Sequence, residues 1–418
     1  MNWKKVKLSD VANTGSGGTP SRTNIDRYFG GNIPWVKSGE LKSNLILNTE
    51  EYINDLAIRE SSAKVIPKDS ILVALYGATV GNTAILGVDA ATNQAVCYIV
   101  PKMNHVLNKY IFYLLKSRLN ELLSMRVGGA QPNISQQVIK DISFFLPSIS
   151  EQEQIVEILD KANEIKMKKI KAIEKSEKII TSLFYKMFGD PIVLLNDTNS
   201  INLIDFNIDI QNGFACGNKD VKDGISHLRM NNISDLGILN LDLVRTVPLS
   251  YKSEKYQLKN HDILFMSTNS EDKVGKSCIF YKPDSKDYLF SNHLIRLRLN
   301  DDRLTSEYLG FFLHLLWSKR HFSKIAKRWV NQATVSSTNL GFTKIYIPKK
   351  SKLIKFTNIY KELFNVNKNL RKSNEYFEKL FDTLLYKSFT GELTAKWREK
   401  NSDILSKEIE ERKQKYGF

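Results

Sequence analysis

The chain contains a long internal repeat, and this feature constrains its architecture more than any other. Residues 147–188 align without a gap with residues 348–389, which lie 201 positions later. Pro147 matches Pro348, and Phe188 matches Phe389. A repeat of this size predicts two copies of one structural unit. Both copies end in a long helical segment, so we expect two modules, each followed by one long helix.

The same order of elements precedes each helical segment. In the first module, β-branched runs predict strands at 71–76, 83–88, 95–100 and 142–146, with a helix over 108–125. In the second module, the corresponding strands fall at 263–266, 277–281, 293–299 and 344–347, with a helix over 306–328. The offset between the modules is 192 at Ile71/Ile263, 194 at Gly81/Gly275, 199 at Asn93/Asn292 and 201 at Ile134/Val335. A shared scaffold with loops of different length places specificity in the loops.

These patterns predict an α+β chain in which two tandem α/β modules alternate with two long helices. The expected boundaries are 1–147 for the first module, 148–190 for the first helix, 191–348 for the second module, 349–398 for the second helix and 399–418 for a charged C-terminal helix or tail. The length of 418 residues is enough for domains with cores of their own.

Apolar residues in both helical segments recur in alternating steps of four and three, which is the seam of a coiled coil. The seam residues are Ile158, Ala162, Ile165, Ile179 and Leu183 in the first helix, and Ile359, Leu363, Val366, Leu370, Phe377, Leu380 and Leu384 in the second. We expect the helices to form an antiparallel coiled coil about a pseudo-two-fold axis. In the centred register Lys169 lies opposite Ser373, and Ala162 lies opposite Leu380. The alternative is that each amphipathic helix packs on its own module.

The chain is strongly basic, with a formal net charge of +16 and a pI near 9.4. This charge favours nucleic acid as a partner, although a generically basic protein is the alternative. No apolar run approaches the roughly 20 residues of a membrane span, so no membrane partner is expected. Three widely spaced cysteines argue against a disulfide framework and indicate a reducing cytoplasm.

Motifs for catalysis are missing from the sequence. Gly275-Lys276-Ser277 ends like a phosphate-binding loop, but Ser270 stands where that loop requires its first glycine. There is no Pro-Pro dipeptide, and the six histidines lack the spacing of a metal site. We therefore expect neither catalytic residues nor a metal site in this chain.

Polar residues gather in predicted loops at matched places of the two modules. Asn and Gln side chains can pair with adenine, Arg and Lys with guanine, and Ser or Thr with phosphate. The candidate DNA contacts of the first module are Lys37, Ser38, Tyr76, Thr79, Asn82, Asn93, Gln94, Gln131 and Asn133. Those of the second are Arg229, Asn231, Asn232, Asn269, Lys273, Asn292, His293, Arg328, Gln332 and Thr334. Each of them alone could equally be an ordinary turn residue.

Over its whole length the chain resembles the specificity subunits of type I restriction–modification systems. The resemblance rests on Gly17-Gly18-Thr19-Pro20-Ser21, Ile33-Pro34-Trp35, the Gly-x-Gln-Pro-Asn-Ile-Ser pattern at 129–135, Ser150-Glu151-Gln152-Glu153-Gln154-Ile155, and Phe389-Thr390-Gly391-Glu392-Leu393-Thr394. The second module departs from the pattern. Gln332-Ala333-Thr334-Val335 replaces its Gln-Pro element, and Ser351-Lys352-Leu353-Ile354 replaces its Glu-Gln element.

The resemblance implies a non-catalytic, DNA-binding subunit of the cytoplasm and nucleoid that recognises a bipartite target. Each module would be a target-recognition domain for one half-site, and the helices would set the spacer. Two methyltransferase subunits would bring S-adenosylmethionine, and two restriction subunits would use ATP and Mg²⁺, so this chain would bind no cofactor. These partners are expected to dock near residues 151–155 and 388–398. Two alternatives are a recognition subunit of a type II-like or orphan methyltransferase, and a coiled-coil interaction protein without a DNA role.

Overall fold

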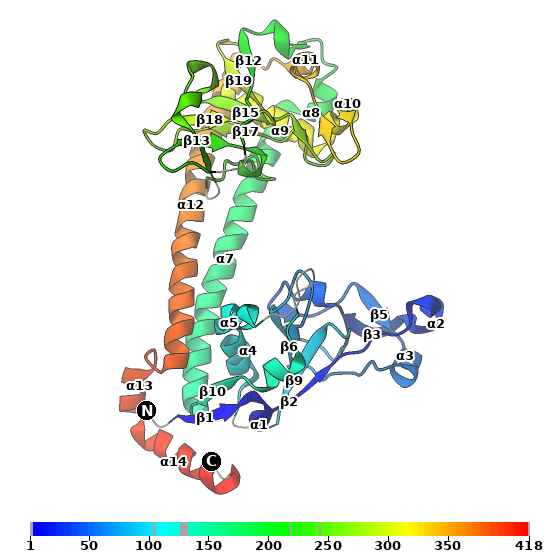
Figure 1. The fold of residues 1–418 in the computed structure, drawn as a ribbon, viewed down its shortest axis with the longest axis vertical. Helices are drawn as coiled ribbons and strands as arrows, with labels where there is room; N and C mark the ends of the chain where they lie inside the picture. The colour runs from blue at the N-terminus through cyan, green and yellow to red at the C-terminus, as the bar shows by residue number, and fades with distance from the viewer. Residues whose placement is uncertain (1–2, 103–105, 126–132, 218–219, 242–243, 417–418) are drawn as a thin grey trace. The chain divides into compact units, whose positions relative to one another are not determined.

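The computed structural model describes residues 3–102, 106–125, 133–217, 220–241 and 244–416, which form two compact units (Figure 1). Unit one comprises residues 1–169 and 373–418, and unit two comprises residues 170–372. The division crosses both long helices, α7 (Ile149–Phe188) and α12 (Lys350–Thr390). Each unit therefore contains one module and a part of each helix. This arrangement confirms the predicted α+β class with two modules and two long helices.

The module of unit one is built on a five-stranded sheet. Its strand order is β2 (Ala12–Ser16), β9 (Val96–Pro101), β6 (Ile71–Ala74), β7 (Thr83–Leu86), β4 (Leu45–Ile46). A three-stranded sheet has the order β5 (Glu51–Ile53), β3 (Phe29–Val36), β8 (Ala91–Thr92), and β1 (Lys4–Lys7) pairs with β10 (Ser143–Leu146). The central strand β6 is buried at all four positions, which explains its continuous apolar sequence.

Helix α4 (Asn108–Ser117) packs against this sheet and is buried on all sides, because residues 110–115 are all buried. Tyr110, Ile111, Leu114 and Leu115 are buried in the same core as residues of β6 and β9. The helix predicted over 108–125 is interrupted at Arg118, and α5 (Leu119–Ser124) follows. The remaining helices of this module are short: α1 (Leu8–Val11), α2 (Ile25–Tyr28), α3 (Asp55–Glu60) and α6 (Gln136–Lys140).

Unit two repeats the plan with a four-stranded sheet of order β12 (Ile208–Asn212), β19 (Leu294–Leu299), β15 (Asp262–Met266), β17 (Ser277–Phe280). The other sheets are β14 (Arg245–Val247), β13 (Ile225–Leu228), β18 (Tyr288–Phe290); then β16 (Thr268–Asn269), β21 (Ala333–Thr334), β20 (Lys327–Arg328); and the pair β11 (Ser200–Asn202), β22 (Lys344–Tyr346). The helices are α8 (Pro191–Leu194), α9 (Ser306–Ser318), α10 (His321–Ile325) and α11 (Ser337–Gly341).

The helix predicted over 306–328 is broken after Ser318, continues as α10 over His321–Ile325, and is wrong beyond Ile325. Helix α9 ends at Ser318, and Arg320 adopts a left-handed conformation with φ 58°. A left-handed residue cannot continue a right-handed helix, so the chain turns there. Lys327 and Arg328 consequently lie in strand β20 instead of on a helix face.

Equivalent hydrogen bonds show which residues of the two modules correspond. The N–H of Gly81 donates to the carbonyl of Ala74 at 2.8 Å, and the N–H of Gly275 donates to that of Met266 at 2.8 Å. Both glycines have a positive φ, 84° and 97°, which a residue without Cβ adopts most easily. The predicted correspondence of Gly81 with Gly275 is therefore confirmed.

The predicted correspondence of Asn93 with Asn292 is wrong by one residue. The N–H of Asn93 donates to the carbonyl of Val36 at 2.9 Å, and in unit two Ser291 donates to Leu228 at the same distance. Strand pairing agrees, because β8 joins β3 in parallel as β18 joins β13. Both modules carry an asparagine here, and residue identity alone favoured the wrong alignment.

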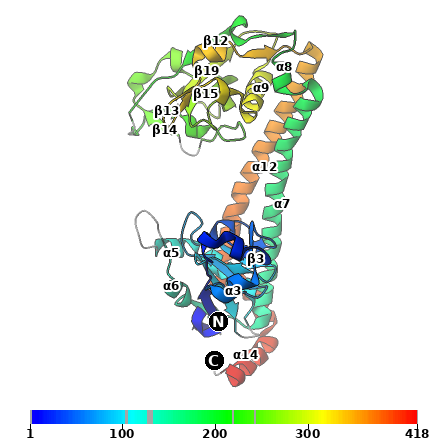
Figure 2. The same ribbon diagram turned by 90° about the vertical axis from the view of Figure 1, so that its right-hand side faces the viewer.

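Within each unit, α7 and α12 run side by side and antiparallel (Figures 1 and 2). In unit one, Lys169 Nζ donates to Ser373 Oγ at 2.7 Å, which is the pairing predicted from the centred register. In unit two, Lys352 Nζ donates to the carbonyl of Met187 at 3.0 Å, and Arg371 forms an ion pair with Glu177. High residue numbers of one helix thus meet low numbers of the other, as an antiparallel coiled coil requires.

Four of the twelve predicted seam residues are displaced by one position. Ile165, Ile179, Val366 and Leu380 are each about half exposed, so their assignment to the seam is wrong. The more buried neighbours are Lys166, Ile180, Asn367 and Phe381. Ala162 is buried, and the other predicted seam residues are of intermediate exposure: Ile158, Leu183, Ile359, Leu363, Leu370, Phe377 and Leu384. The predicted layer of Ala162 with Leu380 is replaced by burial of Ala162 and Phe381 in one core.

The displacement has a simple cause, because several true seam positions are polar. Lys166 forms an ion pair with Glu378, and its Nζ lies 5.4 Å from the ring centroid of Phe381. Asn367 is only 4% exposed, and Asn374 has a buried Oδ1. A search for apolar periodicity skips such positions and selects the apolar residue beside them.

The chain ends in two further helices of unit one, α13 (Ala395–Lys400) and α14 (Ser402–Tyr416). Arg412 Nη1 donates to the carbonyls of Leu146 and Pro147, which fixes α14 against the start of α7. Glu151, Gln152 and Ile155 are 2%, 0% and 0% exposed. The predicted partner contact at these three residues is therefore wrong, because their side chains are buried within the unit. Glu151 accepts hydrogen bonds from Thr394 and Arg398 of the C-terminal segment, and Gln152 bonds to Leu107 and Pro147.

No helix among the described residues is long and apolar enough to cross a membrane. Those same residues contain no group of His, Cys, Asp and Glu that could hold a metal ion.

Candidate nucleic-acid interface

The turn after β3 and the turn after β13 have the same geometry. Glu40 Oε1 accepts a hydrogen bond from the N–H of Lys37 at 2.9 Å. In the second module, Asn232 Oδ1 accepts one from the N–H of Arg229 at 2.8 Å. Each acceptor satisfies a backbone donor at the start of a short 3₁₀ turn. Both modules therefore place a cation, Lys37 or Arg229, first in a matched turn.

The two cations have different surroundings. Lys37 Nζ lies 2.7 Å from Glu50 Oε2 and 3.0 Å from Glu51 Oε1, and hydrogen bonds to these carboxylates raise the pKa of Lys37. Burial and the nearby charge of Arg245 lower the pKa of Arg229. A DNA contact by Lys37 would have to replace its carboxylate partners, whereas Arg229 stands beside a second cation.

Asn232 is reassigned from base contact to support of this turn. It is 1% exposed, and its Nδ2 donates to the carbonyl of Asn240 at 2.8 Å. Both groups of its side-chain amide are thus engaged within the module. The neighbouring Asn231 is exposed on the turn that Asn232 holds.

In unit one the loop after β6 folds onto the turn after β3. Thr79 is 8% exposed, and its Oγ1 donates to the carbonyl of Ser38 at 2.8 Å. Thr79 is therefore also a support residue, while Asn82 is partly exposed at the end of the same loop. Tyr76 forms an isolated antiparallel bridge with Asn133. Ser38, Tyr76, Thr79 and Asn133, distant in sequence, are brought together by these bonds.

The remaining candidates of unit one differ in exposure. Gln94 is exposed, whereas Asn93 is partly buried, with its Oδ1 unpartnered in the part of the chain that the structure describes. Gln131 lies outside the described residues. The N–H of Asn93 reaches Val36, directly before Lys37, so this loop adjoins the first turn.

In unit two the equivalent loops meet in the small sheet β16-β21-β20. Thr268 Oγ1 and Thr334 Oγ1 are 3.2 Å apart across this sheet. Asn269 Nδ2 lies 3.1 Å from the sulfur of Met230, in the turn after β13. The N–H of Val335 donates to Ser267 as that of Ile134 donates to Leu75, which confirms the predicted match of Ile134 with Val335.

Most other candidates of unit two lie at its surface. Lys273, Asn292, Arg328 and Gln332 are exposed, and His293 is partly buried. Arg328 Nη2 lies 2.7 Å from Glu271 Oε1, in an exposed ion pair of small expected energy. The backbone carbonyl of His293 accepts from the N–H of Ser267 at 2.9 Å, so His293 adjoins β16.

Two residues of this surface were missed in the sequence. Trp329 is 60% exposed and Val330 is 99% exposed, between β20 and β21. Their signal was an apolar pair inside an otherwise polar loop. The search for base contacts considered polar side chains alone and passed over them.

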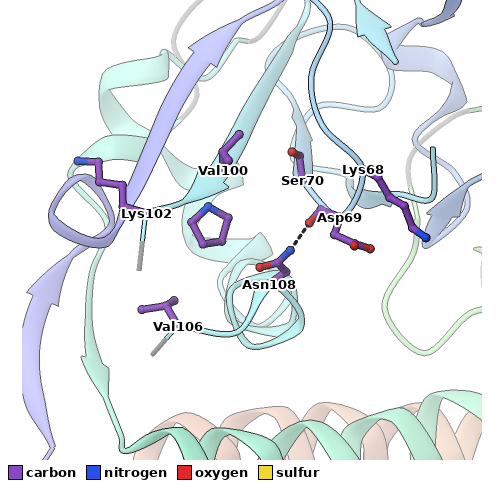
Figure 3. A pocket seen from close by; sticks show the side chains of 8 residues that line it. Lys68, Asp69, Ser70, Val100, Lys102, Val106 and Asn108 are labelled. Atoms are coloured by element: carbon purple, nitrogen blue, oxygen red, sulfur yellow. Dashed lines mark hydrogen bonds between the residues drawn. The ribbon is translucent and has the colours of Figure 1, made fainter. Parts of the chain in front are cut away.

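A hollow of about 260 Å³ lies elsewhere in unit one, beside the start of α4 (Figure 3). Its lining includes Lys68, Asp69, Lys102 and Asn108, and Asn108 Nδ2 donates to the carbonyl of Asp69 at 2.5 Å. None of the candidate DNA contacts lines it. Its two lysines lie on opposite sides of the hollow and do not converge on one point.

The buried His227 predicts a pH-dependent stability of unit two. His227 is 1% exposed, and burial together with the charge of Arg229 lowers its pKa to about 4. The unfolded chain binds a proton more readily, so the free energy of unfolding should fall as the pH falls from about 6.5 to about 4, by on the order of 3 kcal/mol. Urea unfolding followed by circular dichroism at both ends of this range measures the effect. The change His227→Phe, which removes the titratable group and keeps an aromatic ring, should flatten the dependence, and an unchanged slope would contradict this assignment.

The family model for the type I restriction modification DNA specificity domain matches residues 1–175 and 231–376. The chain belongs to this family. Among its relatives, the specificity subunit of type I restriction enzyme StySPI from Salmonella potsdam is 23% identical over 431 residues, covering 97% of this chain and 92% of the relative. The EcoR124I/EcoR124II specificity subunit of Escherichia coli is 32% identical over 166 residues. That match spans 38% of this chain and 40% of the relative, which is less than half of its length.

Two solved structures share the fold of this chain. The type I restriction–modification S subunit from M. genitalium superposes with a TM-score of 0.56 at 16% identity, covering 93% of this chain and 96% of that chain. A structure described under complex assembly and conformational transition of the type I restriction–modification system gives a TM-score of 0.53, also at 16% identity, over 94% and 98% of the two chains. The fold of this chain is thus common to all three proteins.

Proposed function

We propose that this chain is the DNA-reading subunit of a type I restriction–modification complex and recognises a bipartite target. Each module reads one half-site through its loop surface, and the paired helices fix the spacer between the half-sites. The observation that carries this proposal is the matched geometry of the first turns. Lys37 and Arg229 stand at equivalent places, each held by a capped 3₁₀ turn, although the surrounding loops differ in length.

The charge of the chain also supports the proposed DNA-binding function. A net charge of +16 provides a field that attracts the phosphate backbone, and polar loop side chains then distinguish base edges. Buried residues such as Thr79 and Asn232 stabilise these loops through hydrogen bonds to backbone carbonyls. A scaffold that holds reading side chains rigidly loses less conformational entropy on binding.

Salt dependence of DNA binding tests this proposal against an interaction protein without a DNA role. The full chain is titrated into a labelled random-sequence duplex at several salt concentrations. With at least six phosphates neutralised, the association constant should fall by about 1,000-fold between 50 and 200 mM salt. Chain binding that is independent of salt, or no binding at 50 mM salt, would contradict the proposal.

Arg229 offers a test at a single position. Replacing Arg229 with alanine should weaken binding to the target by about 1–3 kcal/mol and relax the preference at one base pair. Competition binding against duplexes with one changed base pair measures both effects. Lys222→Ala is the matched control, because Lys222 is an exposed cation of the same module. Lys222→Ala should weaken binding equally on all sequences. If Arg229→Ala also weakened binding equally on all sequences, Arg229 would have no role in base recognition.

The chain would act with subunits that supply the chemistry. We propose two methyltransferase subunits, which bind S-adenosylmethionine, and two restriction subunits, which use ATP and Mg²⁺. Because Glu151, Gln152 and Ile155 are buried, docking near the start of α7 has to use its exposed side, where Glu153 lies. Loss of methyltransferase co-purification after Glu153→Lys, with DNA binding intact, would support this placement. Unchanged co-purification would rule it out.

A further inference from the structure

The hairpin formed by β20 and β21 projects a tip of exposed residues from unit two. Lys327 pairs with Thr334 and Arg328 with Ala333. The N–H of Trp329 donates to the carbonyl of Gln332 at 2.7 Å, which closes the turn. Ala333, which directly follows the turn, is 1% exposed and buried in the main core of the unit. The hairpin is thus anchored through strand β21, while residues 327–332 all lie at the surface.

The tip is apolar although its surroundings are basic. Val330 is 99% exposed and Trp329 is 60% exposed. Lys327 Nζ lies 4.6 Å from the ring centroid of Trp329, a distance at which the cation attracts the ring face. This contact holds the Trp329 ring against the hairpin, and Val330 lies at the tip of the hairpin. Neither apolar side chain contributes much buried area to the fold.

The positive charges around this tip indicate duplex DNA as the partner that it contacts. Lys324, Lys327 and Arg328 are exposed beside it and can contact phosphates, with Arg328 exchanging its exposed ion pair with Glu271 for one with a phosphate. The hairpin also belongs to the same small sheet as Thr268, so it adjoins the candidate base contacts. An apolar side chain within such a surface can gain contact area from DNA only at base faces, thymine methyl groups or sugars.

The exposed apolar pair of this tip has no apolar counterpart in the sequence of the first module. By the offset of 201 that holds at Ile134/Val335, Trp329 and Val330 correspond to Gly128 and Gly129 in the sequence. Glycine has no side chain to insert between bases. The two half-sites would consequently be read by different means, one of them with an apolar wedge.

We propose that Val330, supported by Trp329, inserts between adjacent base pairs of the half-site read by the second module and opens that base step. This inference rests on the proposed function, because it requires that the second module binds duplex DNA. The flanking cations hold the phosphates on either side while the wedge unstacks the step. The energy of unstacking depends on the sequence of the step, so the wedge would contribute specificity without a hydrogen bond to a base.

A mismatch scan tests the wedge. Methylated sites define the target sequence, and single mismatches are then placed at successive steps of each half-site, leaving out the methylated adenines. A mismatch lowers the cost of opening a step, so the wild-type full chain should bind one mismatched duplex about tenfold tighter than the intact one. The preferred step should lie in the half-site of the second module.

The variant W329G/V330G, which copies the glycines of the first module, should lose this preference while still binding the intact duplex. Leu249→Gly is the matched control, because Leu249 is 65% exposed in the same unit and away from the hairpin. It should keep the preference. Wild-type binding without preference for any mismatch, or a preference that survives in W329G/V330G, would overturn the wedge and leave the proposed function intact. Absence of binding to any duplex would overturn both.

Discussion

Replacing Phe184 with alanine is expected to destabilise unit two by about 4 kcal/mol. Phe184 is 0% exposed, and its ring centroid lies 5.7 Å from that of Tyr308 and 5.6 Å from that of Phe356. These contacts join α7, α9 and α12 in one core. Removing the ring would leave a cavity that rigid helices cannot fill, so the lost contacts add to the lost burial.

Urea unfolding of the full chain, followed by circular dichroism, measures this loss in the transition of unit two. Val193→Ala is the matched control, since Val193 is 70% exposed in the same unit, and it should change stability by less than about 0.5 kcal/mol. If Phe184→Ala behaved like this control, the aromatic core would not be what holds the module to its helices.

Replacing Glu151 with alanine is expected to destabilise unit one by about 3 kcal/mol. Glu151 Oε1 accepts hydrogen bonds from Thr394 Oγ1 at 2.6 Å and from Arg398 Nη2 at 2.6 Å, while its Oε2 accepts one from Trp3 Nε1 at 2.8 Å. The carboxylate is 2% exposed and ties together the first residues, the start of α7 and the C-terminal segment. Its removal leaves a cation and two buried donors without their acceptor.

The same unfolding measurement, read in the transition of unit one, tests this contact. Glu153→Ala changes an exposed glutamate two positions along the same helix and should alter stability by less than about 0.5 kcal/mol. Limited proteolysis gives a second readout, because loss of the Glu151 contacts should release residues 395–416 for cleavage before the rest of the unit unfolds. Equal stability and equal cleavage in both variants would show that the contact contributes little.

The Glu151 contact also explains why the second repeat lacks the family pattern. The equivalent of Glu151 is Lys352, which donates to the carbonyl of Met187 instead of accepting from a C-terminal arginine. A lysine suits this place because a backbone carbonyl at the end of α7 needs a donor. The sequence showed that the residue differs between repeats, but the partner of each charge became visible only in three dimensions.

Periodicity predicted the architecture well and the seam only in part. The modules, the long helices and their antiparallel pairing depend on many residues at once, so single deviations did not disturb them. The seam at Ile165 and Leu380 was displaced because polar residues with specific partners, such as Lys166 with Glu378, replace apolar ones on the inner side. Such pairs satisfy each other and leave no apolar signal in either helix.

The sequence predicted the loops of the candidate site better than the individual side chains that would contact DNA. The sequence placed Thr79 and Asn232 among the base contacts because threonine and asparagine suit that chemistry. Their burial instead commits both side chains to backbone carbonyls and donors within the modules. Whether a polar loop residue faces outward or braces the loop depends on neighbours that are distant in sequence.

Mapping of adenine methylation tests the central claim, that each module reads its own half-site, most directly. The chain is produced with its partner subunits, once unaltered and once with residues 191–347 replaced by the corresponding segment of another family member. The methylated sites of the two strains are then compared across the genome. One half-site should change while the other half-site and the spacer length stay the same. A change in both half-sites, or in neither, would contradict the division of reading between the two modules.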